Sequence, residues 1–195
     1  MWPEPITLCG SHAKLTPLSH THLHGLQKAS SNGDLHRLWY TTVPAPLEME
    51  CEISRRLDLC AQEKMLPFTV MTPDGTPVGM TTFMNIDAPN RRLEIGSTWI
   101  SPTVQRTPLN TECKTMLLTY AFEVKECIAV ELRTHVMNHQ SRRAIERLGA
   151  KLDGILRSHM IMADGSLRDT AVYSILAHEW PAVRSNLQAR LEATP

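Results

Sequence analysis

The junction between residues 99 and 111 carries the sequence features best suited to binding an anionic group. It leads from Trp99 and Ile100, at the end of an extended run, into a strongly periodic helical pattern at Thr111. N–H groups in the first turn of a helix have no partner within the helix and lie at the positive end of its dipole, so they suit a pyrophosphate. Arg106 adds a fixed positive charge. The alternative interpretation is an ordinary connecting loop with a polar helix cap.

A second polar group follows the next extended run, at Asn138 and Ser141. Asn138 suits the cap position of a helix, and Arg142 and Arg143 just inside that helix are able to reach phosphate groups. The alternative is that Asn138 is only a cap and that the two arginines belong to a solvated helix face.

The elements that must position these residues alternate between the periods of strands and helices. Extended patterns predict strands over residues 13–18, 66–71, 78–83, 92–100, 128–136, 155–162 and 167–176. Helical patterns cover residues 19–29, 44–61, 111–125 and 141–148, and a last helix starts at Pro181. The strand–helix–strand order over residues 92–136 implies a parallel crossover, whereas Asp74-Gly75 and Asp164-Gly165 indicate antiparallel hairpins. We therefore expect one mixed sheet.

Composition limits the classes of protein that fit. A chain of 195 residues suits one domain, expected over residues 1–195 with residues 1–10 as an N-terminal extension. Lys plus Arg and Asp plus Glu are both 20, which argues against nucleic-acid or membrane partners. Five widely spaced cysteines without a CxxC pair argue against a disulfide framework or a thiolate zinc site, and a reducing cytoplasm fits best.

Two motifs carry a family resemblance. Residues 105–110, Gln-Arg-Thr-Pro-Leu-Asn, resemble a Gln/Arg-x-x-Gly-x-Gly/Ala coenzyme loop, from which Pro108 and Asn110 depart. Residues 138–149 resemble an Asn-x-x-Ser-x-x-Ala-x-x-x-x-Gly block. With further likeness along nearly the whole chain, the sequence resembles the Gcn5-related N-acetyltransferase (GNAT) superfamily, and within it the ribosomal-protein N-terminal (RimJ/RimL-like) acetyltransferases. Pro108 lacks an N–H, which removes one potential phosphate donor, and Glu112 is anionic where the phosphates are expected.

The resemblance implies a fold and a co-substrate. The fold is α/β (α+β), a mixed and mostly antiparallel sheet flanked by helices, with a V-shaped splay between the fourth and fifth strands. Acetyl-CoA is the implied co-substrate, with its pantetheine arm in the splay, and no metal is implied. The implied coenzyme-binding residues are Trp99, Ile100, Gln105, Arg106, Thr107, Leu109, Asn110, Thr111, Asn138, Ser141, Arg142 and Arg143.

The implied reaction is direct attack of a primary amine on the thioester in a ternary complex. By resemblance, Glu94 acts on the amine through water, and Ser141 protonates the leaving thiolate or orients its sulfur by a hydrogen bond. The alternatives are a solvent-facing or edge-strand charge for Glu94 and a polar helix-start residue for Ser141. Ile145 stands where many members of the superfamily carry a tyrosine acid. The acceptor is a peptide or protein N-terminus or a small-molecule amine. The alternative function is an acyl-CoA-binding regulatory module with little or no turnover. Exposed strand edges and the last hairpin offer surfaces for a homodimer.

Three other groups have simpler interpretations. His20, His22 and His24 invite a metal hypothesis, but His22 does not share the helical face of the other two. Cys113 falls on the apolar stripe of the strongest helix, which predicts core packing rather than a nucleophile. Trp39 and Tyr40 are predicted to line an acceptor pocket or to be aromatic core residues.

Overall fold

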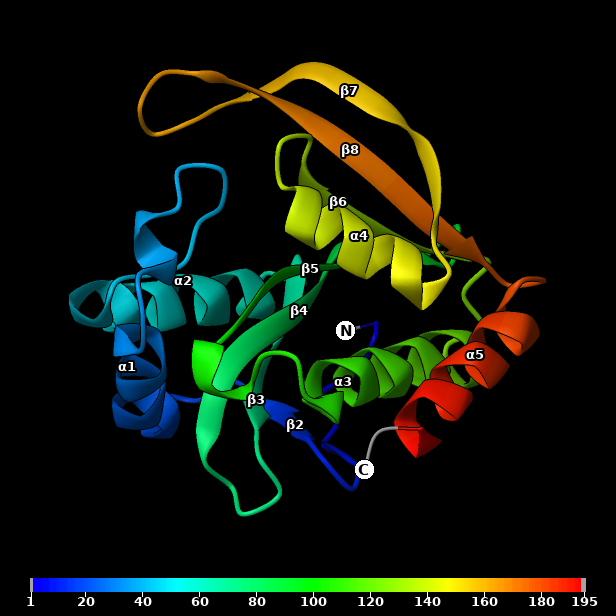
Figure 1. Cartoon of the computed structure of the whole chain (residues 1–195), viewed down its shortest axis with the longest axis horizontal. Coiled ribbons are helices and arrows are strands. Elements are labelled where there is room, and N and C mark those ends of the chain that lie inside the picture. The colour runs from blue at the N-terminus through cyan, green and yellow to red at the C-terminus, as the bar shows by residue number, and fades with distance from the viewer. Residues whose placement is uncertain (1, 194–195) are drawn as a thin grey trace.

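One eight-stranded sheet organises the chain in the computed structural model, which describes residues 2–193 (Figure 1). The strand order is β1-β2-β3-β4-β5-β6-β8-β7, and every adjacent pair is antiparallel except β5 and β6. The strands are β1 Leu8–Cys9, β2 Lys14–Pro17, β3 Met65–Met71, β4 Pro77–Asp87, β5 Arg92–Ile100, β6 Ala129–His135, β7 Lys151–Ile161 and β8 Leu167–Leu176. The predicted mixed, mostly antiparallel sheet is confirmed.

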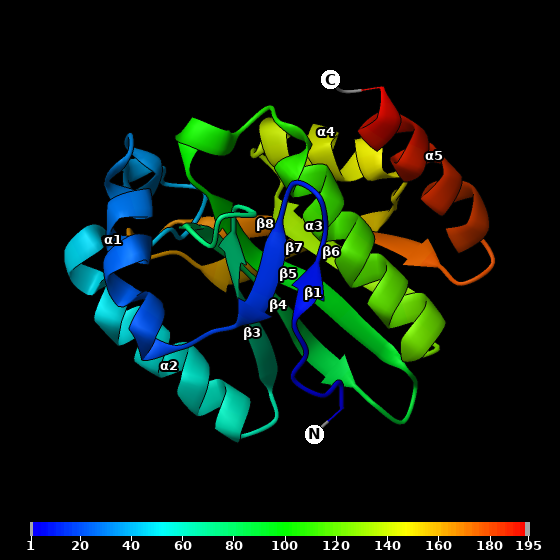
Figure 2. The same ribbon diagram turned by 90° about the horizontal axis from the view of Figure 1, so that it is seen from below.

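Helices lie on both faces of the sheet, as Figures 1 and 2 show together. They are α1 Leu23–Ser31, α2 Met49–Ala61, α3 Pro108–Thr119, α4 His139–Leu148 and α5 Trp180–Glu192. A smaller core cluster, which includes Ile53 of α2, Met80 and Trp99, joins α1 and α2 to one face. A larger cluster, which includes Phe83, Leu117 of α3 and Leu187 of α5, covers the other face. None of the helices in residues 2–193 is long and apolar enough to cross a bilayer.

The parallel pairing of β5 and β6 is short. It contains the residue pairs Arg92–Ala129, Leu93–Val130 and Glu94–Glu131, and within the described residues no pairing continues beyond Glu94. These two strands are the fourth and fifth of the predicted order, because β1 was not predicted. Their parting confirms the V-shaped splay that the family resemblance implied.

A β-bulge at Ser97 helps β5 to turn away. Ser97 has a φ of 47°, and the register between β4 and β5 shifts there. The buried Arg56 of α2 donates to the Ser97 carbonyl oxygen (3.2 Å) and to Thr82 Oγ1 (2.9 Å), and forms an ion pair with Glu52 at 2.7 Å. Because a bulge adds one residue to one strand, the faces of β5 exchange at this point. Trp99 accordingly packs against α1 and α2.

Several predicted boundaries shift in the structure. The helix expected over residues 111–125 begins at Pro108 and ends in a π-helical turn, Tyr120–Val124. Pro108 occupies the first helical position, where proline is favoured, because an N–H there has no partner within the helix. Ser19 caps the helix predicted to run to about Ala29, as expected, but this helix begins as a 3-10 turn, His20–His22, before α1. The expected N-terminal extension contains β1, and β7 starts at Lys151 rather than at residue 155.

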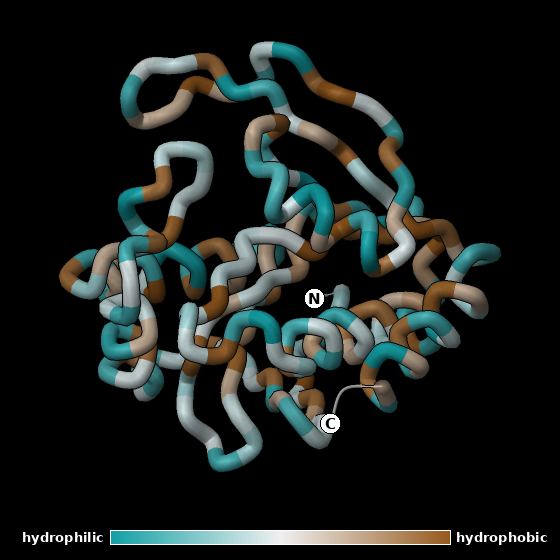
Figure 3. Tube along the Cα trace, in the orientation of Figure 1, coloured by the Kyte–Doolittle hydropathy of each residue, from teal (hydrophilic) through white to brown (hydrophobic). Residues whose placement is uncertain are grey.

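The β7–β8 hairpin extends along the outer edge of the sheet and carries hydrophobic segments (Figure 3). Almost all of β7 is exposed, and its exposed large apolar side chains are Leu152, Ile155, Leu156, Met160 and Ile161. An edge strand of this kind is able to pair with another chain. The homodimer expected from the sequence stays a prediction.

The negative charge of Glu112, which did not suit a phosphate site, has another role in the structure. Its carboxylate accepts hydrogen bonds from the backbone N–H groups of Ser11 (2.9 Å), His12 (2.6 Å) and Ala13 (2.7 Å), in the turn between β1 and β2. A Cβ at Gly10 would lie 2.3 Å from the carboxyl carbon of Glu112, so only glycine leaves room for this contact. Glu112 therefore fastens the N-terminal hairpin to α3, a hundred residues away in sequence.

Replacing Glu112 should loosen this attachment. In Glu112→Gln only one oxygen remains as an acceptor, and we expect the free energy of unfolding to fall by about 2 kcal/mol. Urea denaturation measures this loss, and Glu50→Gln, an exposed carboxylate on α2, is the matched control. Equal stabilities of the two variants would contradict the role of Glu112.

Candidate active site

The first turn of α3 forms one end of the candidate site. Thr107 is the cap residue, with extended backbone, and its Oγ1 accepts from the Leu109 N–H at 3.4 Å. In a helix that begins at Pro108, the Thr111 N–H binds the Thr107 carbonyl oxygen, whereas the N–H groups of Thr107 and Asn110 have no intrahelical carbonyl to bind. These two groups therefore remain for a phosphate, in the place predicted for the coenzyme loop.

The other predicted residues of this loop have diverse environments. Arg106 is exposed, with a φ of 63°. Gln105 donates through Nε2 to the Ile100 carbonyl oxygen at 2.9 Å, which holds the loop to the end of β5. Trp99 points to the α1 and α2 face, so its side chain does not join the group at α3. Asn110 Oδ1 is buried and accepts no hydrogen bond from residues 2–193.

A buried lysine lies one helical turn after Asn110. Lys114 Nζ donates to Thr98 Oγ1 (2.9 Å) and Thr81 Oγ1 (3.3 Å), so it ties α3 to β5 and β4. Burial lowers the pKa of Lys114 to about 8. Among the residues described, no carboxylate forms an ion pair with it. Lys114 therefore fixes the middle of α3 against the sheet.

Asn138 and Ser141 lie across the splay, at the start of α4. Asn138 Oδ1 accepts from the Ser141 backbone N–H at 3.0 Å, which confirms the predicted cap. Ser141 is half-buried, and its hydroxyl forms no hydrogen bond within the described chain. The hydroxyl is therefore available to a ligand in the splay. Ile145, one turn later, is buried in the core.

Arg142 and Arg143 have different environments. Arg142 donates to Tyr173 Oη (2.9 Å) and to the Val136 carbonyl oxygen (3.4 Å), so it is held against the sheet. Arg143 is exposed and lines a cleft of about 500 Å³ between α4 and α5. The cleft is also lined by Glu146, Arg147, Gly149, Asn186 and Arg190.

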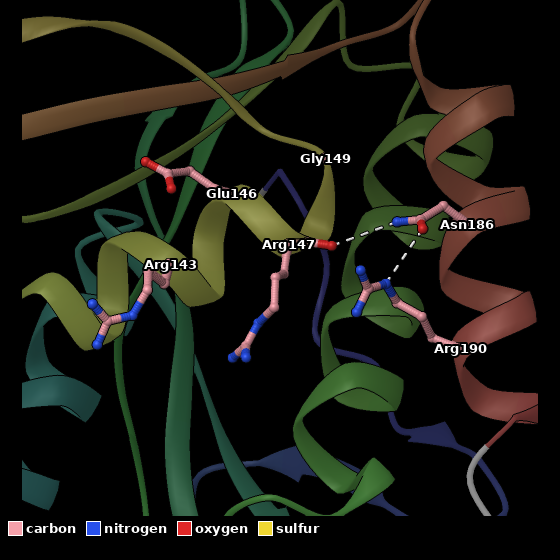
Figure 4. A pocket seen from close by; sticks show the side chains of 6 residues that line it. All are labelled: Arg143, Glu146, Arg147, Gly149, Asn186 and Arg190. Carbon is pink, nitrogen blue, oxygen red and sulfur yellow. Dashed lines mark hydrogen bonds between the residues drawn. The ribbon is translucent and has the colours of Figure 1, made fainter.

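Figure 4 shows Arg143 and Arg147 projecting from α4 and Arg190 reaching toward them from α5. Arg190 Nε donates to Asn186 Oδ1 at 3.3 Å, and Asn186 donates to the Arg147 carbonyl oxygen at 3.5 Å. Sequence reasoning missed Arg147 and Arg190. The spacing of four between Arg143 and Arg147 was a usable signal, since such residues share a helix face, whereas nothing local linked Arg190 to them.

Glu94 lies at the closed end of the splay, on the α1 and α2 face. Its Oε2 accepts from Asn85 Nδ2 at 2.7 Å and lies 3.3 Å from Arg133 Nε. Burial raises the pKa of Glu94, although Asn85 and Arg133 act in the opposite direction. A Cβ at Gly96 would lie 2.6 Å from Glu94 Oε1, so Gly96 leaves space for the carboxylate. A buried carboxyl group of this kind suits general base chemistry.

Glu131 and Arg92 belong to the same group of charged side chains as Glu94 and Arg133. Arg92 Nη2 binds Glu131 Oε1 at 2.9 Å, and Arg133 Nη2 binds Glu131 Oε2 at 2.7 Å. Glu131 is therefore neutralised by two arginines, whereas Glu94 shares only one of them. Sequence reasoning missed Asn85 and Arg133, because their contact with Glu94 depends on strand register.

The other candidate groups are placed as follows. Burial raises the pKa of Cys113 to about 12, so a core role is confirmed and a thiolate nucleophile is disfavoured. His22 Nδ1 lies 2.8 Å from Thr69 Oγ1. In the described part of the chain, no cluster of three His, Cys, Asp or Glu side chains is placed to hold a metal ion. Trp39 is exposed and lies over His135.

The comparisons with known proteins identify the class. Residues 13–151 match the family model described as an acetyltransferase (GNAT) domain, so the chain belongs to this family of acetyltransferases. A crystal structure of a GCN5-related N-acetyltransferase from Brucella melitensis has a TM-score of 0.88 and 34% identity, with 97% of this chain and 86% of that chain covered. The predicted family and fold are thereby confirmed.

Two further relatives lie in the predicted branch. "Putative ribosomal N-acetyltransferase YdaF" from Bacillus subtilis (strain 168) is 36% identical over 107 residues, which cover 55% of this chain and 57% of that protein. The match therefore spans little more than half of the curated relative. Mycobacterium smegmatis RimJ, solved in complex with CoA-disulfide, shares the fold with a TM-score of 0.77 and 23% identity, with 97% of this chain and 95% of that chain covered.

Lys114 should make stability depend on pH. Its pKa is about 8 in the folded chain and 10.5 in the unfolded chain, so between these values the unfolded state binds more protons and stability rises with pH. Lys114→Met should remove this rise and stabilise the protein at pH 7 by up to about 3 kcal/mol. Urea denaturation from pH 7 to pH 10 measures the effect.

The difference between Lys114→Met and the parent isolates this lysine. Burial also raises the pKa values of Cys113 and Cys127, to about 12 and about 11, and these thiols contribute a slope of opposite sign above pH 9. Lys64→Met, at an exposed position, should leave the parent's pH dependence unchanged. A Lys114→Met curve parallel to that of the parent would refute the lowered pKa.

Proposed function

We propose that this chain is an N-acetyltransferase that transfers an acetyl group from acetyl-CoA to a primary amine by direct attack in a ternary complex. The parting of β5 and β6 after Glu94 carries this proposal. It leaves a gap between the first turn of α3, which offers N–H groups to phosphates, and a buried carboxylate that suits a base. Family membership and the CoA-disulfide in the RimJ structure support acetyl-CoA as the co-substrate.

The residues present fit a coenzyme A molecule. The N–H groups of Thr107 and Asn110 suit its pyrophosphate, and the buried Asn110 Oδ1 still lacks a donor within residues 2–193. The cleft lined by Arg143, Arg147 and Arg190 suits a further phosphate, since guanidinium groups bind phosphates in a bidentate manner. Asn138 and Ser141 border the splay from the other side.

The proposed chemistry assigns separate tasks to two residues. When bound, acetyl-CoA supplies the acetyl group as a thioester. Glu94 accepts the proton of the attacking amine through a water molecule, for which its raised pKa is suited. The hydroxyl of Ser141, which has no partner in the described chain, donates to the sulfur of the leaving thiolate. Position 145 of α4 holds a buried isoleucine, so no tyrosine is present there to act as the acid.

The acceptor is a primary amine of a peptide or protein N-terminus or of a small molecule. The name of the curated relative supports the first class, and the partly buried Arg168 near the splay supports the second. The five free thiols are consistent with our proposal of a cytoplasmic location. Acetylation assays with peptides, polyamines and amino acids, after calorimetric proof of acetyl-CoA binding, test the function. Binding without release of CoA on any amine would favour the regulatory module.

Glu94→Gln should lower kcat by a factor of about 10² to 10³ while acetyl-CoA still binds, because the amide cannot accept a proton. In the parent, kcat/KM should fall as pH drops through the raised pKa of Glu94, since only the carboxylate is a base. In Glu131→Gln this acid limb should persist, because Glu131 is already bound by two arginines. An acid limb that survives in Glu94→Gln would assign the base elsewhere.

Arg147→Gln and Arg190→Gln should each weaken acetyl-CoA binding about tenfold, the equivalent of about 1.4 kcal/mol, through loss of a charge-assisted contact to phosphate. Isothermal titration calorimetry measures the dissociation constants. Arg184→Gln is the control, because Arg184 lies on the same helix but pairs with Glu123 at 2.9 Å. Unchanged affinity in the Arg147/Arg190 double variant would exclude the cleft from the coenzyme site.

A further inference from the structure

His135 ends β6 with a buried hydrogen-bond donor that has no partner. The imidazole is 4% exposed and lies on the same face of the sheet as Glu131 and Arg133. Its Nδ1 accepts from the Met137 backbone N–H at 3.1 Å, so the proton of the neutral ring is on Nε2. Nε2 is buried and forms no hydrogen bond with residues 2–193. Unpaired buried donors are rare in folded proteins and often mark a functional position.

The exposed side chain of Trp39 packs against this imidazole and partly covers it. The ring of Trp39 lies edge-on to His135, with 5.1 Å between centroids and an interplanar angle of 79°, and Trp39 is 54% exposed. Trp39 belongs to the segment between α1 and α2, which rises toward the β7–β8 hairpin in Figure 1. The cover over His135 is therefore a loop side chain that an incoming ligand is able to displace or to pack against.

Arg168 on β8 brings a cation to the same place. Its Nε donates to Thr170 Oγ1 at 3.0 Å, and Thr170 is the register partner of His135 on the adjacent strand. Side chains of such cross-strand partners lie side by side, so His135 and Arg168 flank Thr170. Arg168 is partly buried, and no carboxylate in the described chain forms an ion pair with it. Its Nη groups remain without a hydrogen bond to described residues.

We propose that His135 and Arg168 bind an anionic oxygen group, a carboxylate or a phosphate, carried by a small acceptor molecule beside its amine. This inference rests on the proposed N-acetyltransferase function. A neutral N–H donor beside a guanidinium matches an oxyanion, while Glu94, on the same face near the closed end of the splay, matches the amine. The two ends of the acceptor would thus meet opposite charges, which selects for short, dipolar amines.

The structural alternative is that Nε2–H of His135 only points at the Trp39 ring and supports it. In that case His135 would affect all acceptors alike. Recognition of an anionic group would instead affect only the acceptors that carry one. Matched pairs of amines therefore distinguish the two roles.

The first test compares serine with serinamide and O-phosphoethanolamine with ethanolamine. The wild-type enzyme should show kcat/KM at least about tenfold higher for one anionic member than for its neutral partner. Arg168→Gln should remove this preference by raising KM for the anionic amine, with KM for acetyl-CoA unchanged. Arg157→Gln is the control, because Arg157 lies on the same hairpin but is exposed and paired with Asp169 at 2.6 Å.

The second test uses two replacements of His135. In His135→Asn the side-chain oxygen is able to accept from Met137 as Nδ1 does, but the shorter amide carries no donor at the position of Nε2. In His135→Gln the amide keeps a donor near the position of Nε2. The preference for the anionic amine should disappear in the first variant and be partly retained in the second. Trp39→Ala shows the effect of losing the cover alone.

The outcomes separate this inference from the function on which it rests. Equal use of anionic and neutral amines by the wild-type enzyme, preference for tripeptide N-termini over all four amines, or uniform changes across the amines in the His135 and Arg168 variants would overturn the subsite. If acetyl-CoA binds but no amine is acetylated, the proposed function fails. Calorimetric titration of serine and O-phosphoethanolamine into the CoA-bound protein then decides: binding that Arg168→Gln abolishes supports the subsite, and absence of binding refutes it.

Discussion

The short parallel pairing between β5 and β6 is the constraint on which the rest of the structure depends. Beyond Glu94 the facing backbone groups of the two strands have no strand partner, although buried backbone groups nearly always require one. The bulge at Ser97 turns β5 aside, and Arg56 holds that bulge from the opposite layer. The separation of the two strands is thus built into the sheet. A ligand with amide groups along its length would form hydrogen bonds with the unpaired backbone groups that face it.

Buried charges fasten the helices around this gap. Glu112 joins α3 to the N-terminal hairpin, Lys114 joins it to β4 and β5, and Arg56 joins α2 to the bulge. The desolvation of a buried charge offsets much of the stabilisation that its hydrogen bonds provide. The three contacts therefore specify how the helices lie against the sheet more than they add stability. Glu112, an apparent misfit near phosphates, has its charge directed away from the first turn of α3 toward three N–H groups.

Local signals allowed much of the fold to be predicted. The run 92–100 coincides with β5, and Asn138 and Gly149 bound α4 as cap residues with the expected chemistry. The contacts of Glu112 and Arg56 were not predictable, since their partners lie about 100 and 41 residues away and no periodicity records such pairs. Pro108 was interpreted as a lost donor because the helix was expected to begin at Thr111. With the start three residues earlier, the same proline occupies a favoured position.

The two halves of the candidate site also differ in how far they could be predicted from the sequence. The proposed coenzyme half consists of a helix start and a capped turn, each formed by consecutive residues, so Thr107, Asn110 and Asn138 were identifiable from sequence. The acceptor half combines Glu94 on β5, His135 on β6 and Arg168 on β8, and these share a face only because three strands keep their register. A one-residue slip of any strand would turn its side chain to the opposite face. In the proposed acceptor site, selectivity therefore depends on strand register, which only a structure reveals.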